Sequence, residues 1–226
     1  AVLFPRVNLW AGYGGGKTPE TVARLVEAAI DVDLIDPDSL LRSKVSRGSI
    51  EVGKMRYRVL ILPALTCIRR SSAEKILQFV RSGGKLVVEE RFPTDSPEEG
   101  REDAFLKKFG KQLRSLKIEP IATKNVVDVV SKILERDLIV VGCKTSPLRY
   151  HHIKKQGRDI YWIANGERKR GTWTLSFRAK GIPSLWQPED GSIRRVNSYM
   201  RRGGRAILKL SLGPWQGCFV VFDSEP

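Results

Sequence analysis

In the first half of the chain, short apolar runs alternate with stretches of helical periodicity. Residues 1–4 (AVLF) are apolar enough for a strand, and a helix is predicted to begin at Thr18, with Pro19 in its first turn. The apolar positions of this helix recur every three or four residues, at Val22, Leu25, Val26, Ala29 and Ile30. The order of strand, loop and helix is typical of an α/β domain.

The same alternation continues over the next hundred residues or so. Ser71 and Glu74 have the spacing of a capping box at the start of a second helix, and Gly83 and Gly84 predict its end. Further strands are predicted at 31–36 (DVDLID), 58–65 (RVLILPAL), 85–89 (KLVVE) and 138–141 (LIVV), and further helices at 102–116 and 126–134. The run at 58–65 is apolar enough to be buried on both faces, as central strands of parallel sheets are.

After about residue 145 the period of the apolar positions changes from the helical 3.6 to the 2 of a strand. The alternation is clearest in 172–177 (TWTLSF) and 206–212 (AILKLSL). Turn residues such as Asn165-Gly166 and Asp190-Gly191 divide this part into about six short strands. Strands with one dry and one wet face are the pattern of a small antiparallel β-sandwich.

These patterns predict two domains, a number that suits a chain of 226 residues because one core usually serves about 100–150. The β-α-β-β-α-β-α-α-β order over residues 1–144 favours an α/β domain with an open, mostly parallel sheet of the flavodoxin type. Residues 145–226 are predicted to form the β-sandwich, with the domain boundary near 144–147.

Composition restricts the class of protein. Hydrophobic residues make up 41% and charged residues 29%, which is ordinary for a soluble globular protein and too apolar for a disordered one. No apolar run approaches the roughly 18 residues needed to cross a bilayer, and no signal peptide is visible, so we expect a soluble protein without a membrane partner, at an unknown location. The numbering is expected to begin inside a longer or processed chain. The widely separated Cys67, Cys143 and Cys218 predict buried thiols rather than a disulfide framework or a zinc site, and no metal or cofactor is expected.

The formal charge is the unusual global feature. Forty Lys and Arg against 25 Asp and Glu give +15, which would attract nucleic acid, acidic polysaccharide or an anionic membrane. Basic clusters fall near predicted turns of the sandwich at 168–170 (RKR), 194–195 (RR) and 201–202 (RR). On one face they would form a phosphate-tracking patch. A basic protein that binds nucleic acid or another polyanion is therefore one alternative, although high Lys, Arg and Glu content also occurs in heat-adapted proteins.

Several motifs resemble known glycosidases. Residues 57–63 (YRVLILP), a helix, and 80–88 (VRSGGKLVV) resemble the amidotransferase-like domain that follows the catalytic barrel in several glycosidase families. Residues 159–165 (DIYWIAN), 184–193 (SLWQPEDGSI) and 219–222 (FVVF) are similar to the C-terminal part of glycoside hydrolase family 106, where the second string reads roughly ELWDPETGEI.

The resemblance covers nearly the whole chain, from about residue 1 to 223, and includes 33–40 (DLIDPDSL), which resembles the family's FIDEDAL region. Gln187 stands where the family usually has Asp, which puts in doubt a ligand role for that turn. The chain is also more basic than a typical member. These departures concern a site more than the fold.

The resemblance implies a hydrolase of α-L-rhamnosides, with catalytic carboxylates and a calcium site in an N-terminal (β/α)₈ barrel. A barrel needs about 250 residues and eight strand-helix repeats, and no motif in this chain maps onto its acid, base or metal ligands. We therefore assign no catalytic residue. The chain is expected to be an accessory region, an amidotransferase-like α/β domain followed by a β-sandwich. Its expected partners are a catalytic barrel that is absent from this chain or encoded separately, and polysaccharide.

Residues 11–18 (AGYGGGKT) match a relaxed phosphate-loop pattern. In such a loop Gly16, Lys17 and Thr18 would surround phosphates, with the Thr hydroxyl at Mg²⁺. Against this, Pro19 favours Thr18 as a helix cap, and the only counterpart of the usual apolar strand ending in Asp is 85–90 (KLVVEE). Nucleotide binding is the second alternative.

Aromatic residues of the sandwich could offer ring faces to sugars. Trp173 lies on the apolar side of its strand, so we expect it in the core. Trp186 and Trp215 lie next to predicted turns and are the candidates for contact with carbohydrate.

Other reactive residue types lack the context that catalysis needs. Cys67 follows a buried strand but has no flanking glycines for a nucleophile elbow. His151 and His152 are adjacent and would point to opposite faces of a strand, so they cannot chelate one metal together. Adjacent acids also point apart and lack the facing geometry of a glycosidase pair, as in Glu89-Glu90 and Glu98-Glu99.

Overall fold

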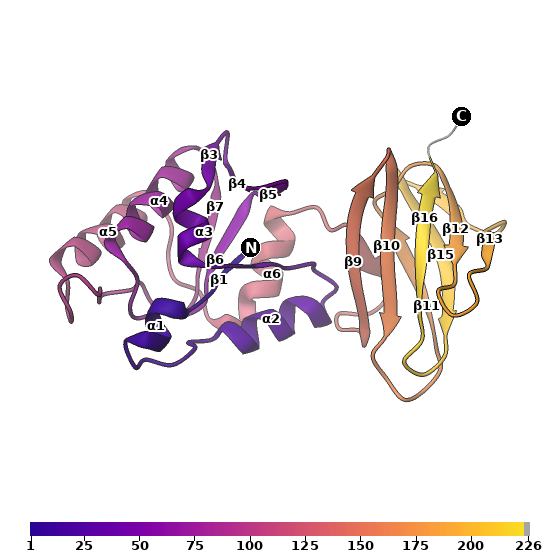
Figure 1. Cartoon of the computed structure of the whole chain (residues 1–226), viewed down its shortest axis with the longest axis horizontal. Helices are drawn as coiled ribbons and strands as arrows, with labels where there is room; N and C mark the ends of the chain where they lie inside the picture. Colours follow the sequence, from indigo (N-terminus) through magenta and orange to yellow (C-terminus); the bar gives the residue numbers. More distant parts are fainter. Residues whose placement is uncertain (224–226) are drawn as a thin grey trace. The chain divides into compact units, whose positions relative to one another are not determined.

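The computed structural model describes residues 1–223, which divide into two compact units (Figure 1). Unit 1 comprises Ala1–Arg24 and Val32–Leu134, and unit 2 comprises Leu25–Asp31 and the chain from Glu135 onward. Each unit is built around its own cluster of buried apolar side chains. Among the described residues, no helix combines the length and apolar character needed to cross a membrane.

Unit 1 contains a four-stranded sheet in which every strand is parallel to its neighbours. The strand order is β2 (Leu34–Ile35), β1 (Val2–Leu3), β6 (Val59–Leu62) and β7 (Lys85–Val88). The predicted parallel α/β sheet is therefore confirmed, although β1 and β2 are shorter than the apolar runs that predicted them. All four residues of β6 are buried, as expected for a central strand covered on both faces.

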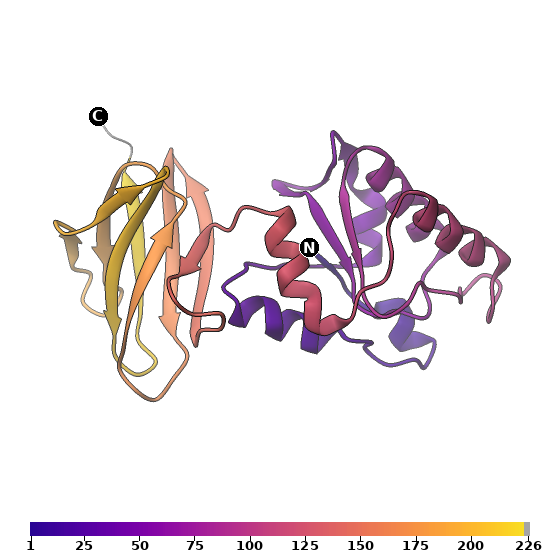
Figure 2. The same ribbon diagram turned by 180° about the vertical axis from the view of Figure 1, so that it is seen from behind.

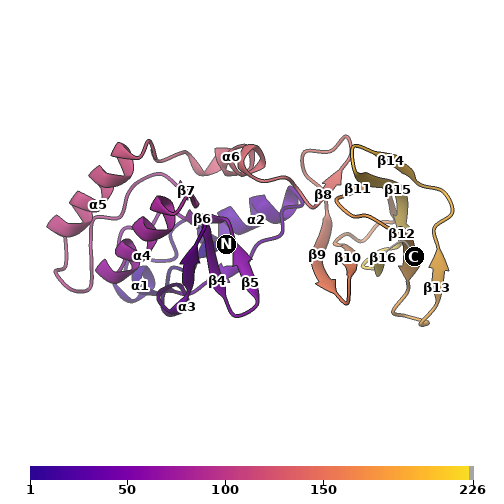
Figure 3. The same cartoon turned by 90° about the horizontal axis from the view of Figure 1, so that it is seen from above.

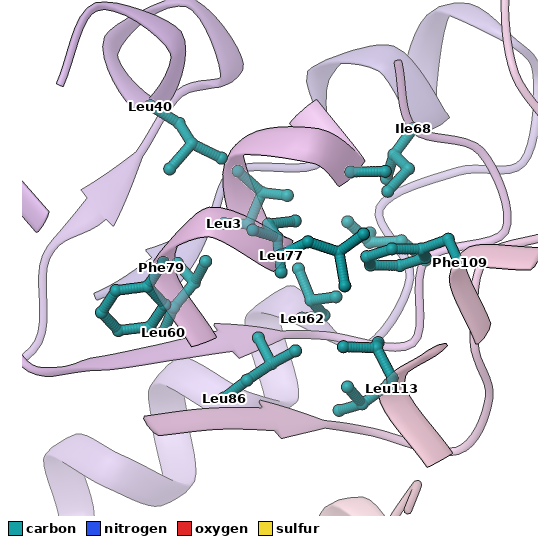
Figure 4. Packing of buried hydrophobic residues seen from close by; sticks show 14 of the residues in the cluster. Leu3, Leu40, Leu60, Leu62, Ile68, Leu77, Phe79, Leu86, Phe109 and Leu113 are labelled. Carbon is teal, nitrogen blue, oxygen red and sulfur yellow. The ribbon is translucent and has the colours of Figure 1, made fainter. Parts of the chain in front are cut away.

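Helices surround this sheet. They are α1 (Arg6–Trp10), α2 (Thr18–Glu27), α3 (Pro37–Arg42), α4 (Arg70–Arg81), α5 (Ala104–Ser115), the 3₁₀ turn η1 (Thr123–Asn125) and α6 (Val126–Ile133). Leucines of the strands pack against α4 and α5 on one face, where Phe109 lies beside Leu77 (Figure 4). In unit 1, α6 lies on the other face, in front of the sheet when seen from behind (Figure 2).

Residues 44–57 form an antiparallel meander that the helical and strand periods did not predict. Its strands are β3 (Lys44–Ser46), β4 (Ser49–Val52) and β5 (Met55–Tyr57). Arg47 and Gly48 both have positive φ, 46° and 71°, as a two-residue type I′ hairpin turn requires.

The start of α4 differs from the prediction. Arg69 is its N-cap residue, so Ser71 lies inside the first turn and the predicted capping box with Glu74 is wrong. The carboxylate of Glu98 instead accepts from the N–H of Arg70, at 3.3 and 3.4 Å. An acceptor 28 residues away in the chain cannot be found from local spacing.

The end of α4 lies where the two glycines predicted it. Gly83 N–H donates to Val80 O at 2.9 Å, and Gly84 N–H donates to Phe79 O at 3.0 Å. This pair of bonds is the Schellman motif, which needs a left-handed residue after the cap, and Gly83 has a φ of 96°.

Gly84 also has no room for a side chain. An added Cβ would lie 2.1 Å from Cε2 of Phe79, whose ring is fully buried. We expect Gly84→Ala to lower the free energy of unfolding of unit 1 by about 1–3 kcal/mol, measured by amide hydrogen exchange in α4. Gly15→Ala is the matched control, because its added Cβ meets no atom within 4 Å. Equal effects of the two substitutions would contradict this packing.

Unit 2 consists of two antiparallel sheets that face each other, seen along their strands in Figure 3. The five-stranded sheet has the order β13 (Ile193–Arg195), β12 (Ile182–Trp186), β16 (Gly217–Asp223), β10 (Arg158–Asn165) and β9 (Leu148–Lys155). The four-stranded sheet has the order β14 (Met200–Arg202), β15 (Arg205–Leu212), β11 (Gly171–Phe177) and β8 (Leu138–Val140). The second half thus has the predicted antiparallel, sandwich-like sheets.

Alternate residues of these strands fill the space between the two sheets. Tyr161 contacts Phe177 and Phe222 edge to face, with ring centroids 5.0 and 5.9 Å apart. Trp173 packs against this core from its margin, and Leu175 lies within it.

β8 is not part of the parallel sheet, although the predicted order of elements made it the last strand of the α/β domain. Instead of extending the parallel sheet, it pairs antiparallel with β11, and Leu138 lies opposite Phe177. Leu138 and Val140 are buried in the core of unit 2. An apolar run of this length suits either kind of sheet, so its periodicity could not decide between them.

Candidate functional site

Three connections meet at one end of the sandwich and line an open cavity of about 730 Å³. They are the β9–β10 hairpin, the segment between β11 and β12, and the β14–β15 hairpin. The volume falls in the range of small-ligand sites. The ionisable residues of its lining are His152, Lys154, Asp159, Arg178, Lys180 and Arg201.

His152 is held between two carboxylates. Its Nδ1 lies 3.3 Å from Oδ2 of Asp137, and its Nε2 lies 2.9 Å from Oδ1 of Asp159. The ring stacks on Tyr161 with centroids 4.0 Å apart, and only 8% of the side chain is exposed. These contacts fix the orientation of the His152 imidazole. The neighbouring His151 is half exposed, and its Nδ1 lies 3.0 Å from Oδ2 of Asp31.

Asp137 connects His152 to Arg178. Burial raises the pKa of Asp137, but hydrogen bonds from His152 and Arg178 outweigh this effect, so its pKa lies below the usual value. Arg178 Nε donates to Asp137 Oδ1 at 2.8 Å, and Arg178 Nη1 lies 3.6 Å from Glu135. The ionised carboxylate thus holds the guanidinium in place at the cavity.

Arg201 is held by main-chain carbonyl groups. Its Nη1 donates to Ala179 O at 3.0 Å, its Nη2 donates to Gly181 O, and its guanidinium lies over the ring of Tyr199. Carbonyl dipoles orient this cation but do not neutralise its charge.

The lining carries four cationic side chains and one carboxylate, Asp159. Lys154 lies 3.3 Å from Asp159, and 75% of its side chain is exposed. Within the described residues Lys180 has no ion-pair partner, and it is exposed. Asp159 pairs with Lys154, and Asp137 pairs with Arg178. The positive charge of the lining that no carboxylate among the described residues offsets is therefore that of Lys180 and Arg201, and the two arginines are fixed donors for the oxygen atoms of a ligand.

The two predicted aromatic candidates lie elsewhere in unit 2. Strand pairing places Trp162, Phe219 and Trp186 side by side across β10, β16 and β12. Trp186 Nε1 donates to Ser184 Oγ at 2.9 Å, so the indole N–H is bonded within its own strand, β12. Trp215 lies in the β15–β16 connection and is 64% exposed. Neither lines the cavity, and contact of either with carbohydrate stays a prediction.

In the glycine loop of unit 1, residues 11–18, the polar groups of Lys17 and Thr18 bond to other residues of unit 1. Lys17 N–H donates to Pro63 O at 2.9 Å, and Thr18 N–H and Oγ1 both contact Gly15 O, at 3.3 and 2.8 Å. Lys17 Nζ lies 3.0 Å from Glu20. An added Cβ at Gly16 would lie 2.5 Å from Pro63 O, so a glycine is required there. Phosphate binding by Gly16, Lys17 and Thr18 stays a prediction.

Glu89 and Glu90 follow β7 and have different surroundings. Glu89 is fully buried, and its Oε2 accepts from Thr21 Oγ1 at 2.6 Å and Thr123 Oγ1 at 3.3 Å. Burial raises the pKa of Glu89 to about 7. Glu90 is exposed, and hydrogen bonds from Thr123 hold its pKa below the usual value. The two acids do not face each other as a glycosidase pair would.

Two of the three cysteines are buried, as predicted, but Cys143 is exposed. It follows β8 in a turn, outside the strand whose apolar character favoured burial. Burial raises the pKa of the Cys67 thiol to about 11, and of the Cys218 thiol to about 12. Such thiols are protonated and poorly nucleophilic near neutral pH.

The three basic clusters are spread over different parts of unit 2. Residues 168–170 follow β10 at the end opposite the cavity, residues 194–195 lie on the edge strand β13, and residues 201–202 lie on β14. Arg201 alone among them contributes to the cavity lining.

Comparison with known proteins gives relatives among carbohydrate-active enzymes. A protein of Formosa agariphila named "Putative beta-glucuronidase" is 27% identical over 231 residues, which cover 96% of this chain and 19% of that protein. The structure of a rhamnosidase from Novosphingobium sp. PP1Y matches 86% of this chain and 20% of its own, with a TM-score of 0.71 and 21% identity. An exo-carrageenase of Bacteroides ovatus shares the fold with a TM-score of 0.59 and 13% identity, over 99% of this chain and 29% of its own.

The chain thus spans about a fifth of the length of the first two relatives. Residues 20–201, which include strands of both units and most of the cavity lining, match the sequence pattern of one family, described as α-L-rhamnosidase. The chain belongs to glycoside hydrolase family 106, the α-L-rhamnosidase family.

Proposed function

We propose that this chain is the accessory, non-catalytic region of an α-L-rhamnosidase-like glycosidase, and that its sandwich contacts the saccharide. The cavity of unit 2 carries this proposal, because it combines the volume of a ligand site with side chains whose donors are fixed in place. Family membership makes a saccharide the ligand class with the strongest support.

The relatives support the accessory role through their length. They are about five times as long as this chain, which leaves room in them for a catalytic barrel of about 250 residues. The described part of unit 1 buries three acids, Glu89, Asp95 and Asp103. Each is engaged by a neighbouring side chain rather than open to a sugar, Glu89 by Thr21 and Thr123, Asp95 by Tyr13, and Asp103 by Arg70. In this proposal unit 1 supports the barrel, and unit 2 orients the substrate.

Binding without hydrolysis is the direct test. In calorimetric titration with a rhamnose-containing oligosaccharide, the chain is expected to bind and to release no new reducing ends. Lys154→Ala is expected to weaken binding about fivefold, the effect of losing one hydrogen bond of about 1 kcal/mol. Lys169→Ala, at the opposite end of β10, should leave the affinity unchanged. Hydrolysis by the isolated chain, or no binding at all, would overturn the proposal.

A further inference from the structure

The charge of the cavity is concentrated where the segment between β11 and β12 meets β14. Arg201 donates to the carbonyls of Ala179 and Gly181, the two residues that flank Lys180. Lys180 and Arg201 both line the cavity, and neither has a carboxylate partner within the described residues. Placing like charges together is unfavourable unless an anion lies near both.

We infer that the cavity recognises the anionic group of a saccharide, a carboxylate or a sulfate. This inference rests on the proposed function and narrows its substrate class to acidic sugars. Lys180 and Arg201 bind the anionic group, and Lys154 and Arg178 lie in the same lining to bind hydroxyl or further anionic oxygens. Bonds between cationic donors and anionic acceptors are about twice as strong as those between neutral groups.

Arg178 and His152 show how the site keeps its shape without a ligand. Asp137 fixes both side chains, and Asp159 fixes His152 from the other side. Arg178 and Arg201 are therefore ordered before a ligand binds, which reduces the entropy that these two side chains lose on binding. Asp159 also repels an anion, so the binding position lies toward Lys180 and Arg201, away from that carboxylate.

The spread of charge favours a compact anion over a nucleic-acid backbone. A duplex presents phosphates along its whole length and is bound by cations that follow them. Here the basic clusters at 168–170 and at the cavity lie at opposite ends of the sandwich, and residues 194–195 lie on an edge strand. Lys180 and Arg201, by contrast, both line one cavity of limited volume, which suits a compact anionic group.

The experiment compares charged and neutral forms of the same sugars. One pair of probes is a tetragalacturonate and its carboxyl-reduced form, and the other is a carrageenan tetrasaccharide and its desulfated form. Each is titrated into the whole chain at fixed ionic strength. The anionic member of at least one pair is expected to bind at least tenfold more tightly, and the pair that shows the difference identifies carboxylate or sulfate as the ligand group.

Charge-reversal variants then locate the site. Lys180→Glu is expected to weaken binding of the preferred anionic probe at least tenfold and to leave the neutral form nearly unchanged. Lys169→Glu makes the same charge change at the opposite end of β10 and is the matched control. Both side chains are exposed, so neither substitution should unfold the chain, and circular dichroism checks this.

Each other outcome has a definite meaning. Equal binding of charged and neutral sugars overturns this inference but leaves the proposed function standing. Absence of binding to all four probes overturns the inference, and titration with the rhamnose-containing oligosaccharide then decides the proposed function separately. An equal loss in Lys180→Glu and Lys169→Glu assigns the affinity to overall charge rather than to the cavity, and so overturns the inference. The inference is also overturned if duplex DNA binds as tightly as the anionic sugar and Lys180→Glu weakens the binding of both equally.

Discussion

Replacing Phe109 with alanine is expected to lower the free energy of unfolding of unit 1 by about 3–5 kcal/mol. Its ring is 1% exposed and lies between α5 and the face of the sheet, beside Leu77 (Figure 4). The substitution removes buried apolar area and leaves a cavity that the parallel strands cannot close. Amide hydrogen exchange in β6 and β7 measures the loss in unit 1 separately from unit 2.

Phe105→Ala is the matched control on the same helix. Phe105 is only partly buried at the margin of the same cluster, so its removal exposes less area and leaves a smaller cavity. The loss should be clearly smaller than for Phe109. If the two variants unfold alike, the core does not have the centre that the structure assigns to it.

Glu89→Gln is expected to stabilise unit 1 relative to the parent at pH 8 and to have little such advantage at pH 4. Burial raises the pKa of Glu89 to about 7, from an ordinary value of 4.5. Its Oε1 is buried without a hydrogen-bond partner among the described residues, so ionisation places an uncompensated charge inside unit 1. An uncharged side chain of the same shape removes that cost.

The direction follows from the two pKa values. Between pH 4.5 and about 7 the unfolded chain loses this proton while the folded chain keeps it, so stability falls as pH rises. A shift of this size corresponds to on the order of 3 kcal/mol, and the stability difference between parent and Glu89→Gln should change by that amount between pH 4 and pH 8. Glu90→Gln is the control, because the pKa of Glu90 is lowered and its substitution should give no gain at pH 8. A pH-independent difference for Glu89→Gln would show that folding does not raise the pKa of this carboxyl.

Local patterns in the sequence were sufficient for much of the fold. The helical period and the paired glycines predicted α4 and its end, because a Schellman motif is built from neighbouring residues. The alternation in β11 and β15 likewise predicted strands with one buried face. These features depend on residues a few positions apart, which a linear pattern contains.

Features that depend on distant partners were not predictable in this way. The N–H of Arg70 at the start of α4 is satisfied by Glu98, and β8 pairs with β11 almost 40 residues later, as in the pair Leu138 and Phe177. The meander at residues 44–57 did carry a signal, since its turns contain Gly48 and Gly53 between short alternating runs. That signal is short, and the longer helical and strand periods on either side of it dominate the pattern.

The cavity of unit 2 also depends on residues that are distant in the sequence, so local patterns did not predict it. Lys154, Arg178 and Lys180 were not candidates, because each lies beside a turn and resembles an ordinary solvated cation. They come together only when three separate connections meet at one end of the sandwich. Arg201 belonged to a predicted basic cluster, but its role depends on the carbonyls of Ala179 and Gly181, some 20 residues away.

Backbone amide chemical shifts in an NMR titration test most directly whether the saccharide binds at the cavity of unit 2. We expect a rhamnose-containing oligosaccharide, or the acidic sugar that binds best, to perturb the amides of Gly157, Gly181 and Gly204, which line the cavity from its three connections. Residues 11–18 should be unaffected. Perturbation confined to the glycine loop of unit 1, or the absence of any perturbation, would contradict saccharide binding at this cavity.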